Sequence, residues 1–143
     1  MKRILTTDNI VLGAEYTDRF EAIRACGKIL LDGGYVKETY IDDMLERERL
    51  FSVYVGNHVA IPHGVDNSES HIIESGISIL QLKNGVYFGK EKAYLMFGIA
   101  GKNGTHIDIL SQIAQCCMDE ENIRKMCETT EKQEILQILN ISI

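Results

Sequence analysis

One histidine is a candidate nucleophile because of the residues on either side of it. His63 lies between Pro62, the only proline in the chain, and Gly64. The apolar residues 59–61 are typical of a short buried strand, and a proline ends such a strand because it cannot donate to a sheet ladder. Gly64 allows a turn at low steric cost. The pattern predicts a histidine at the end of a strand, with room for a bulky group to approach its ring.

The same local pattern also has a plainer interpretation. A histidine at a strand end is more often a surface or hydrogen-bonded residue than a nucleophile. On the other hand, neutral imidazole is nucleophilic at neutral pH without a separate base. Phosphoryl transfer needs mainly positioning and stabilisation of charge on the three equatorial oxygens. If this protein performs chemistry, His63 is therefore the best nucleophile available, and phosphoryl transfer without a metal is a reaction that it suits.

Two further residues could stabilise charge on a phosphoryl group. His106 is expected in the first turn of a helix, where free N–H groups and the helix dipole favour phosphate. The plainer interpretation of His106 is a polar first-turn residue. Arg47 is expected in the last turn of an earlier helix, and its guanidinium group can contact a phosphoryl group at two points. Arg49 is a rival, because nothing local places either arginine near His63.

Other kinds of site find little support in the sequence. A zinc site built from the four histidines, His58, His63, His71 and His106, is an alternative, but their spacing is unlike that of known zinc ligands. We predict that His58 and His71 are surface residues. The chain has no Walker loop, Rossmann glycine pattern, Gly-x-Ser-x-Gly motif or His-Glu-x-x-His motif. We therefore expect neither a cofactor nor a metal.

Composition narrows the class of protein. A length of 143 residues predicts one domain, residues 1–143, with a real core. Hydrophobic residues make up 45% and charged residues 25%, as in ordinary globular proteins. The net charge of −6 and the lack of a Lys/Arg cluster argue against nucleic acid as a partner. No apolar run approaches the ~18 residues that span a bilayer, and the N-terminus does not resemble a signal peptide.

The cysteines indicate a reducing compartment. The four are Cys26, Cys116, Cys117 and Cys127, and none forms a Cys-x-x-Cys pair. Adjacent Cys116 and Cys117 point to different sides of a predicted helix and should not form a disulfide. We predict four reduced thiols in a cytoplasmic protein.

Hydrophobic periodicity places the candidate residues on a framework of helices and strands. Helices are predicted from a cap at Thr17 or Asp18 to residues 33–34, over 37–49, from a cap at Thr105, and around 123–127 and 135–139. Strands are predicted at 9–12, 51–55, 59–61, 76–82, 86–89 and 94–100, with turns at 56–57 and 84–85. The helix over 37–49 is expected to bury Ile41, Met44 and Leu45. The helix after Thr105 is expected to bury Ile107, Leu110, Ile113, Ala114, Cys117 and Met118. Residues 94–100 are almost wholly apolar, as expected for a central strand covered on both faces. Helices before and after the strands predict a sheet between two helical layers.

Several segments together give a resemblance to a known family. They are residues 44–48, 56–57, 59–64, 76–79, 85–86 with Gly89, 97–103 and 106–111. On these segments, and over essentially its whole length, the chain resembles the enzyme IIA component of the phosphoenolpyruvate-dependent sugar phosphotransferase system, mannitol/fructose type. The segment 97–111 most resembles the mannitol branch in its stand-alone, single-domain form.

The resemblance implies a fold, a reaction and three site residues. The implied fold is an α/β three-layer α/β/α sandwich with a mixed sheet and helices on both faces. His63 matches the histidine that accepts a phosphoryl group from the phosphocarrier protein HPr and passes it to a cysteine of enzyme IIB. His106 matches the second active-site histidine, and Arg47 the active-site arginine. The implied activity is a metal-independent phosphotransferase with a phosphohistidine intermediate, which serves mannitol uptake in the cytoplasm without inserting into the membrane.

Two positions depart from the mannitol branch. Val65 stands where that branch usually has threonine, and Thr105, preceded by Gly104, stands where it usually has glutamate. Neither departure removes a transferring group, so both bear on the sugar more than on the reaction. The alternatives are a fructose-type enzyme IIA, a regulatory nitrogen-type relative, and a binding module in which His63 never carries phosphate.

Overall fold

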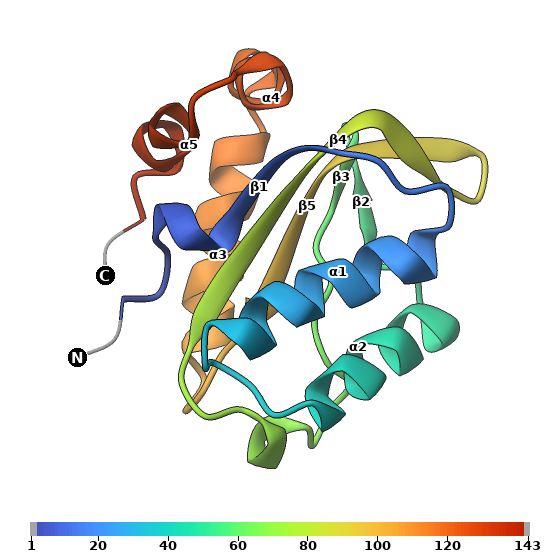
Figure 1. Ribbon diagram of the computed structural model, residues 1–143, viewed down its shortest axis with the longest axis vertical. Coiled ribbons are helices and arrows are strands. Elements are labelled where there is room, and N and C mark those ends of the chain that lie inside the picture. The colour runs from blue at the N-terminus through green and yellow to red at the C-terminus, as the bar shows by residue number, and fades with distance from the viewer. Residues whose placement is uncertain (1–2, 142–143) are drawn as a thin grey trace.

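A mixed sheet forms the middle layer of the molecule (Figure 1). The computed structural model describes residues 3–141, apart from the side chain of His106. Within these residues the sheet has five strands, in the order β1 (Ile10–Ala14), β4 (Gly76–Phe88), β5 (Glu91–Ala100), β3 (Val59–Ala60) and β2 (Tyr54–Gly56). The pairs β1–β4 and β3–β5 are parallel, and the pairs β4–β5 and β2–β3 are antiparallel.

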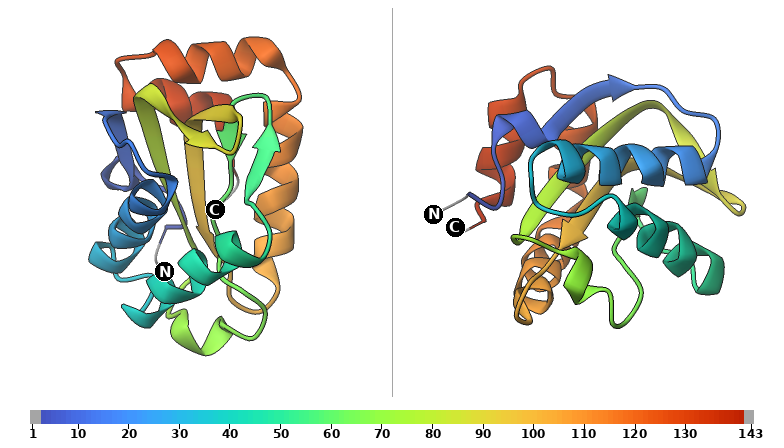
Figure 2. Two further views of the ribbon diagram at one scale, coloured as in Figure 1. Left: turned by 90° about the vertical axis from the view of Figure 1, so that its right-hand side faces the viewer. Right: turned by 60° about the horizontal axis from the view of Figure 1, so that its bottom comes forward.

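Helices cover both faces of this sheet, as two further views show (Figure 2). One face carries α1 (Arg19–Asp32) and α2 (Thr39–Leu50); the other carries α3 (Thr105–Cys117), α4 (Glu120–Glu128) and α5 (Lys132–Leu139). Two short 3-10 turns, η1 (Thr7–Asn9) and η2 (Glu69–His71), lie in the connections. The predicted three-layer sandwich with a mixed sheet is confirmed.

The two central strands contribute to a separate core on each side of the sheet. Successive side chains of a strand point to opposite faces. Ile79 and Phe97 therefore pack with the apolar residues of α3, α4 and α5. Leu80 and Met96 pack with those of α1 and α2. The prediction that residues 94–100 form a central strand covered on both faces is confirmed.

The sequence signals of the first two helices also agree with the structure. Asp18 caps α1, because its carboxylate accepts a hydrogen bond from the Phe20 N–H group at 2.7 Å. The predicted inner face of α2, formed by Ile41, Met44 and Leu45, is buried.

Two predictions about membranes and thiols can be compared with the described residues. Among the helices that they form, none is long and apolar enough to cross a membrane. All four cysteines are free thiols, as predicted.

Two predicted strand boundaries are wrong. Residues 84–85 do not form the hairpin turn, because β4 continues to Phe88. Gly85, with φ of 70°, instead lies where the register between β4 and β5 shifts. The predicted strand at 51–55 begins only at Tyr54. Phe51 ends α2, and its side chain is 73% exposed.

The predicted buried face of α3 is also partly wrong. Residues four apart share one face of a helix, and the row that packs on the sheet is Ile109, Ile113 and Cys117. Ile107 and Met118 are 64% and 79% exposed. Ala114 was also predicted to be buried, and it is exposed as well. As a result, α3 carries apolar side chains that are exposed on the surface of the protein.

Candidate functional site

His63 lies where the chain leaves β3 beside the end of β5. The carbonyl of Pro62 accepts a hydrogen bond from the Ile99 N–H group at 2.9 Å, and His63 forms a parallel bridge with Ile99. This pairing extends the contact of β3 with β5 beyond Ala60 and fixes the backbone at the histidine. The predicted position of His63 at the mouth of a strand is therefore found in the structure, with its side chain half-buried.

Two contacts define the tautomer of the His63 ring. Nδ1 lies 2.7 Å from the carbonyl oxygen of Ile61, which can only accept, so Nδ1 carries the hydrogen. Nε2 lies 3.3 Å from Nε of Arg47, which can only donate, so Nε2 presents its lone pair. The assignment follows from the hydrogen-bond partners. The unprotonated nitrogen is therefore the one on the arginine side of the ring.

The last turn of α2 brings one of the two candidate arginines to the histidine. Besides its contact with His63, Arg47 donates from Nη1 to the carbonyl of Phe51 at 3.4 Å, and its guanidinium lies 5.6 Å from the centre of the Phe51 ring. Arg49 instead donates to Glu46 at 3.2 Å. The structure thus places Arg47, and not Arg49, beside His63.

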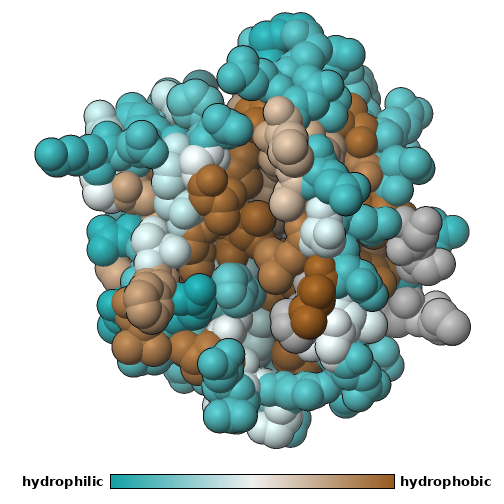
Figure 3. Space-filling view, turned by 180° about the vertical axis from the view of Figure 1, so that it is seen from behind, coloured by the Kyte–Doolittle hydropathy of each residue, from teal (hydrophilic) through white to brown (hydrophobic). Residues whose placement is uncertain are grey.

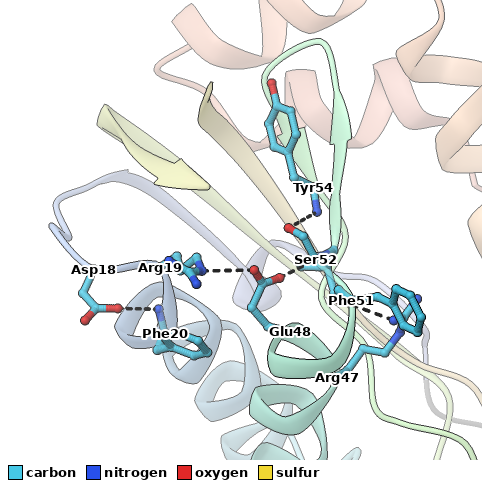
Figure 4. Close-up of polar contacts among 9 residues, drawn as sticks. Asp18, Arg19, Phe20, Arg47, Glu48, Phe51, Ser52 and Tyr54 are labelled. Carbon is cyan, nitrogen blue, oxygen red and sulfur yellow. Dashed lines mark hydrogen bonds and ion pairs between the residues drawn. The ribbon is translucent and has the colours of Figure 1, made fainter. Parts of the chain in front are cut away.

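A buried carboxylate fixes the chain that follows α2. Glu48, with a side chain only 2% exposed, accepts a bond from Nε of Arg19 at 3.0 Å and from the Val53 N–H group at 2.7 Å. Figure 4 shows Arg19 reaching Glu48 from α1, with Arg47 next to Phe51 on the far side of the same helix end. Glu48 therefore ties α1, α2 and the segment before β2 together directly behind Arg47.

The opening of α3 lies on the same cleft. Gly104, with φ of 80°, is the N-cap, and no side chain caps the helix. The predicted cap at Thr105 is wrong: Thr105 is the first helical residue, and its hydroxyl donates to the carbonyl of Lys102 at 2.8 Å. His106 follows in the first turn, as predicted, but its side chain lies outside the described part of the chain. The structure brings the start of this helix, rather than a placed imidazole, to the cleft.

The cleft has a volume of about 680 Å³ and is lined from four segments of the chain. They are α2 with Phe51, the loop that begins at His63, the end of β5, and the first turns of α3 with Gly104. Leu50, Phe51 and Ile107 on its wall are 60%, 73% and 64% exposed. Seen from behind, hydrophobic side chains gather across the middle of the molecule, with hydrophilic ones around them (Figure 3). A histidine and an arginine thus open onto a cleft with exposed apolar walls.

The remaining histidines differ in their surroundings. His58 is exposed, as predicted. His71 is partly exposed at the surface, with its side chain 36% exposed, and its Nδ1 lies 2.5 Å from the Asp43 carboxylate. Across the side chains that the structure describes, no group of three or more His, Cys, Asp or Glu residues could hold a metal ion.

One residue of the site was not predicted. Tyr40 lines the cleft, and its hydroxyl contacts the backbone on the C-terminal side of His63. The sequence signal for it is weak: a tyrosine on the buried face of a helix needs a partner for its hydroxyl, but that partner lies 24 positions away.

Comparison with solved structures identifies the class of protein first. The fold resembles the crystal structure of IIA mannitol from Escherichia coli, with a TM-score of 0.88 and 36% identity over 94% of this chain and 98% of that one. It also resembles a chain in the NMR structure of the complex of enzyme IIA and phosphorylated enzyme IIB for mannitol from Escherichia coli. There the TM-score is 0.90 and the identity 35%, over 95% of this chain and 96% of that one.

Sequence comparison then shows the family. Residues 3–141 match the family described as "Phosphoenolpyruvate-dependent sugar phosphotransferase system, EIIA 2", and the chain belongs to it. A relative from Geobacillus stearothermophilus, named mannitol-specific phosphotransferase enzyme IIA component, is 49% identical over 138 residues, which cover 96% of this chain and 95% of the relative. The family predicted from the resemblance of the sequence is confirmed.

Proposed function

We propose that this protein is the enzyme IIA phosphocarrier of a mannitol phosphotransferase system. It accepts a phosphoryl group from phosphorylated HPr on His63 and passes it to a cysteine of enzyme IIB, in the cytoplasm. The observation that carries the proposal is the His63 ring, whose Nε2 lone pair faces Arg47 at the cleft. The mannitol-specific relative and the solved complex of a IIA chain with phosphorylated IIB support the choice of sugar and acceptor.

The first half-reaction forms the phosphohistidine. Nε2 of His63 attacks the phosphorus held on the HPr histidine, a P–Nε2 bond forms, and the P–N bond to HPr breaks with its electron pair returning to the HPr imidazole. Positive charge then grows on the His63 ring, and the Ile61 carbonyl stabilises the Nδ1–H group that remains. The Arg47 guanidinium turns from Nε2 to the phosphoryl oxygens, which its fork matches.

In the second half-reaction, a cysteine of enzyme IIB takes the phosphoryl group from His63. The cysteine thiolate of enzyme IIB attacks the same phosphorus, a P–S bond forms, and the P–Nε2 bond breaks with its electron pair returning to His63. Because the group must leave as readily as it arrives, only interactions stronger in the transition state than in the phosphorylated protein help both steps. His106 and the opening of α3 would supply such interactions. The exposed apolar walls at Leu50, Phe51 and Ile107 would let HPr and enzyme IIB dock in turn.

Transfer of label from phosphoenolpyruvate tests the proposal. With enzyme I and HPr present, the protein should acquire phosphate that is stable in base and labile in acid. His63→Ala should fold but take no label, whereas the matched control His58→Ala should label like the wild type, because His58 is exposed and away from the cleft. A chelator should leave the rate unchanged. Labelling of His63→Ala, or loss of transfer on chelation, would overturn the assignment.

A further inference from the structure

A tyrosine hydroxyl interrupts the sheet ladder immediately after His63. In a regular parallel ladder, the Ile99 N–H group bonds to the Pro62 carbonyl, and the Ile99 carbonyl then accepts from the Gly64 N–H group. The first of these bonds is present at 2.9 Å. In place of the second, the Tyr40 hydroxyl accepts from the Gly64 N–H group at 2.8 Å and donates to the Ile99 carbonyl at 2.7 Å.

The surroundings of Tyr40 suit a hydroxyl that must accept and donate at once. Its side chain is buried, with the residue only 2% exposed. Burial raises the pKa of Tyr40 to about 12, with a smaller contribution from the Asp43 charge, so the hydroxyl keeps its proton at neutral pH. A Cβ atom at Gly64 would lie 2.6 Å from the Tyr40 ring and 2.5 Å from the Ser68 hydroxyl. The glycine beside the histidine is therefore what lets the tyrosine ring approach.

Tyr40 and Arg47 act on His63 from the same helix. They are separated by two turns of α2, so they lie on one face of it, with buried Met44 between them. Arg47 contacts the ring of His63, and Tyr40 holds the backbone that follows it. Any shift of that backbone would move Nε2 relative to the guanidinium.

We propose that Tyr40 is a positioning residue for phosphoryl transfer. Its hydroxyl lies between the backbone after His63 and β5, keeps the two apart, and so directs Nε2 into the cleft beside Arg47. The role rests on the proposed function of His63. Without the hydroxyl, the Gly64 N–H group must either remain without a hydrogen-bond acceptor or donate directly to the Ile99 carbonyl. The second outcome draws His63 toward β5, and a misplacement of about 1 Å can cost on the order of 10²-fold in rate.

The experiment compares Tyr40→Phe with Tyr35→Phe. Tyr35 is a matched control, because its side chain is also buried and its hydroxyl also donates to a carbonyl and accepts from an N–H group. It donates to the Arg3 carbonyl at 2.7 Å and accepts from the Asn9 amide at 3.1 Å, and it does not line the cleft. Both variants should be less stable to urea by similar amounts. Only Tyr40→Phe should slow transfer from HPr to His63 and from His63 to enzyme IIB, by about 10–10²-fold.

A second readout does not depend on phosphate. Nitrogen-15 NMR of the unphosphorylated protein reports which ring nitrogen of His63 is protonated. The wild type and Tyr35→Phe should show hydrogen on Nδ1, and Tyr40→Phe should show a changed tautomer mixture. Gly64→Ala, which pushes the ring of Tyr40 away and keeps its hydroxyl, should change the signal and the rate in the same direction.

The outcomes separate this proposal from the proposed function. A wild type that takes no phosphate from HPr would refute the function, and the NMR comparison would still test the position of the ring. Wild-type transfer rates in Tyr40→Phe, or an unchanged His63 spectrum in both Tyr40→Phe and Gly64→Ala, would overturn the role of Tyr40. Equal slowing in Tyr40→Phe and Tyr35→Phe would also overturn it, because the loss would then be one of general stability.

Discussion

The Nε–H group of Arg47 donates to Nε2 of His63 at 3.3 Å, across 16 positions of sequence. The contact joins the last turn of α2 to the end of β3. In the resting protein it covers the lone pair that would attack phosphorus. At 3.3 Å the bond is at the long limit for hydrogen bonds in proteins, so it is a weak one. In the proposed mechanism, the guanidinium can therefore release the ring at low cost when a phosphoryl group arrives.

Replacement of this arginine should slow transfer without unfolding the protein. Arg47→Lys keeps the positive charge but loses the planar fork that contacts two oxygens at once. We expect both half-reactions to slow by about 10²-fold, as when one preorganised donor is lost. The matched control is Arg49→Lys, because Arg49 lies on the same turn but pairs with Glu46. Rapid-quench rates for both variants check this prediction, and equal rates for the two would contradict it.

His106 should affect the rate of transfer rather than the site of phosphorylation. It lies in the first turn of α3, on a helix whose N-cap and exposed Ile107 line the cleft. We expect His106→Ala to be phosphorylated at His63 but to transfer the group about 10²–10³-fold more slowly, above all to enzyme IIB. His106→Gln should recover part of the rate, because its amide can still donate.

Circular dichroism is the folding control for both His106 variants. The buried row of α3 begins at Ile109, so the helix should survive either change. Wild-type rates in both half-reactions for His106→Ala would mean that His106 is only a polar first-turn residue.

The preference among enzyme IIB proteins should identify the sugar. Phosphorylated protein should pass its phosphate faster to a mannitol-type enzyme IIB than to a fructose-type one, which rapid-quench measurement with both acceptors would show. Equal or reversed rates would favour a fructose-type enzyme IIA. Transfer to neither acceptor, with normal labelling of His63, would favour a regulatory relative.

The buried carboxylate of Glu48 should contribute more to the stability of the protein than the exposed carboxylate of Glu46. The Glu48 carboxylate is 2% exposed and accepts bonds from Arg19 and from the Val53 N–H group. Glu48→Gln removes the charge, and loss of a charge-assisted bond to a buried group costs about 1.5–3 kcal/mol. The control is Glu46→Gln, because the Glu46 side chain is 49% exposed and surface changes stay within about 0.5 kcal/mol. Urea denaturation measures both, and equal losses would contradict the prediction.

The protein should lose stability in alkali through the buried thiol of Cys26. Burial raises the pKa of Cys26 from 9.0 to about 12, partly offset by a hydrogen bond with Ser78. The unfolded chain therefore releases this proton at lower pH than the folded protein. The resulting stability is complete below pH 9 and is lost as the pH rises toward 12, by about 1.4 kcal/mol per pH unit for one group.

Urea denaturation across this pH range checks the effect. Cys26→Ala should be less stable at every pH, because it leaves a cavity, but its stability should fall less steeply with pH than that of the wild type. Parallel curves for the two proteins would show that Cys26 does not titrate as its burial requires.

Local features of the sequence were sufficient to predict the three layers of the fold and the ends of several helices and strands. The period of apolar residues identified the inner face of α2, Asp18 identified the start of α1, and the apolar residues 94–100 identified the central strand. Pro62 marked the end of a strand at His63. These features act over one or two turns, or within one strand, so they are visible without knowledge of the neighbouring elements.

Tertiary structure decided which of several equivalent residues meet. Arg47 and Arg49 share one helical turn, and only the packing of α2 beside β3 directs Arg47 to His63. Gly85 and Gly89 both have positive φ, and the pairing of β4 with β5 places the bulge at the first and the turn at the second. The hydroxyl of Tyr40 reaches across 24 positions to the Gly64 N–H group. Such contacts depend on the register between distant elements, which no local pattern encodes.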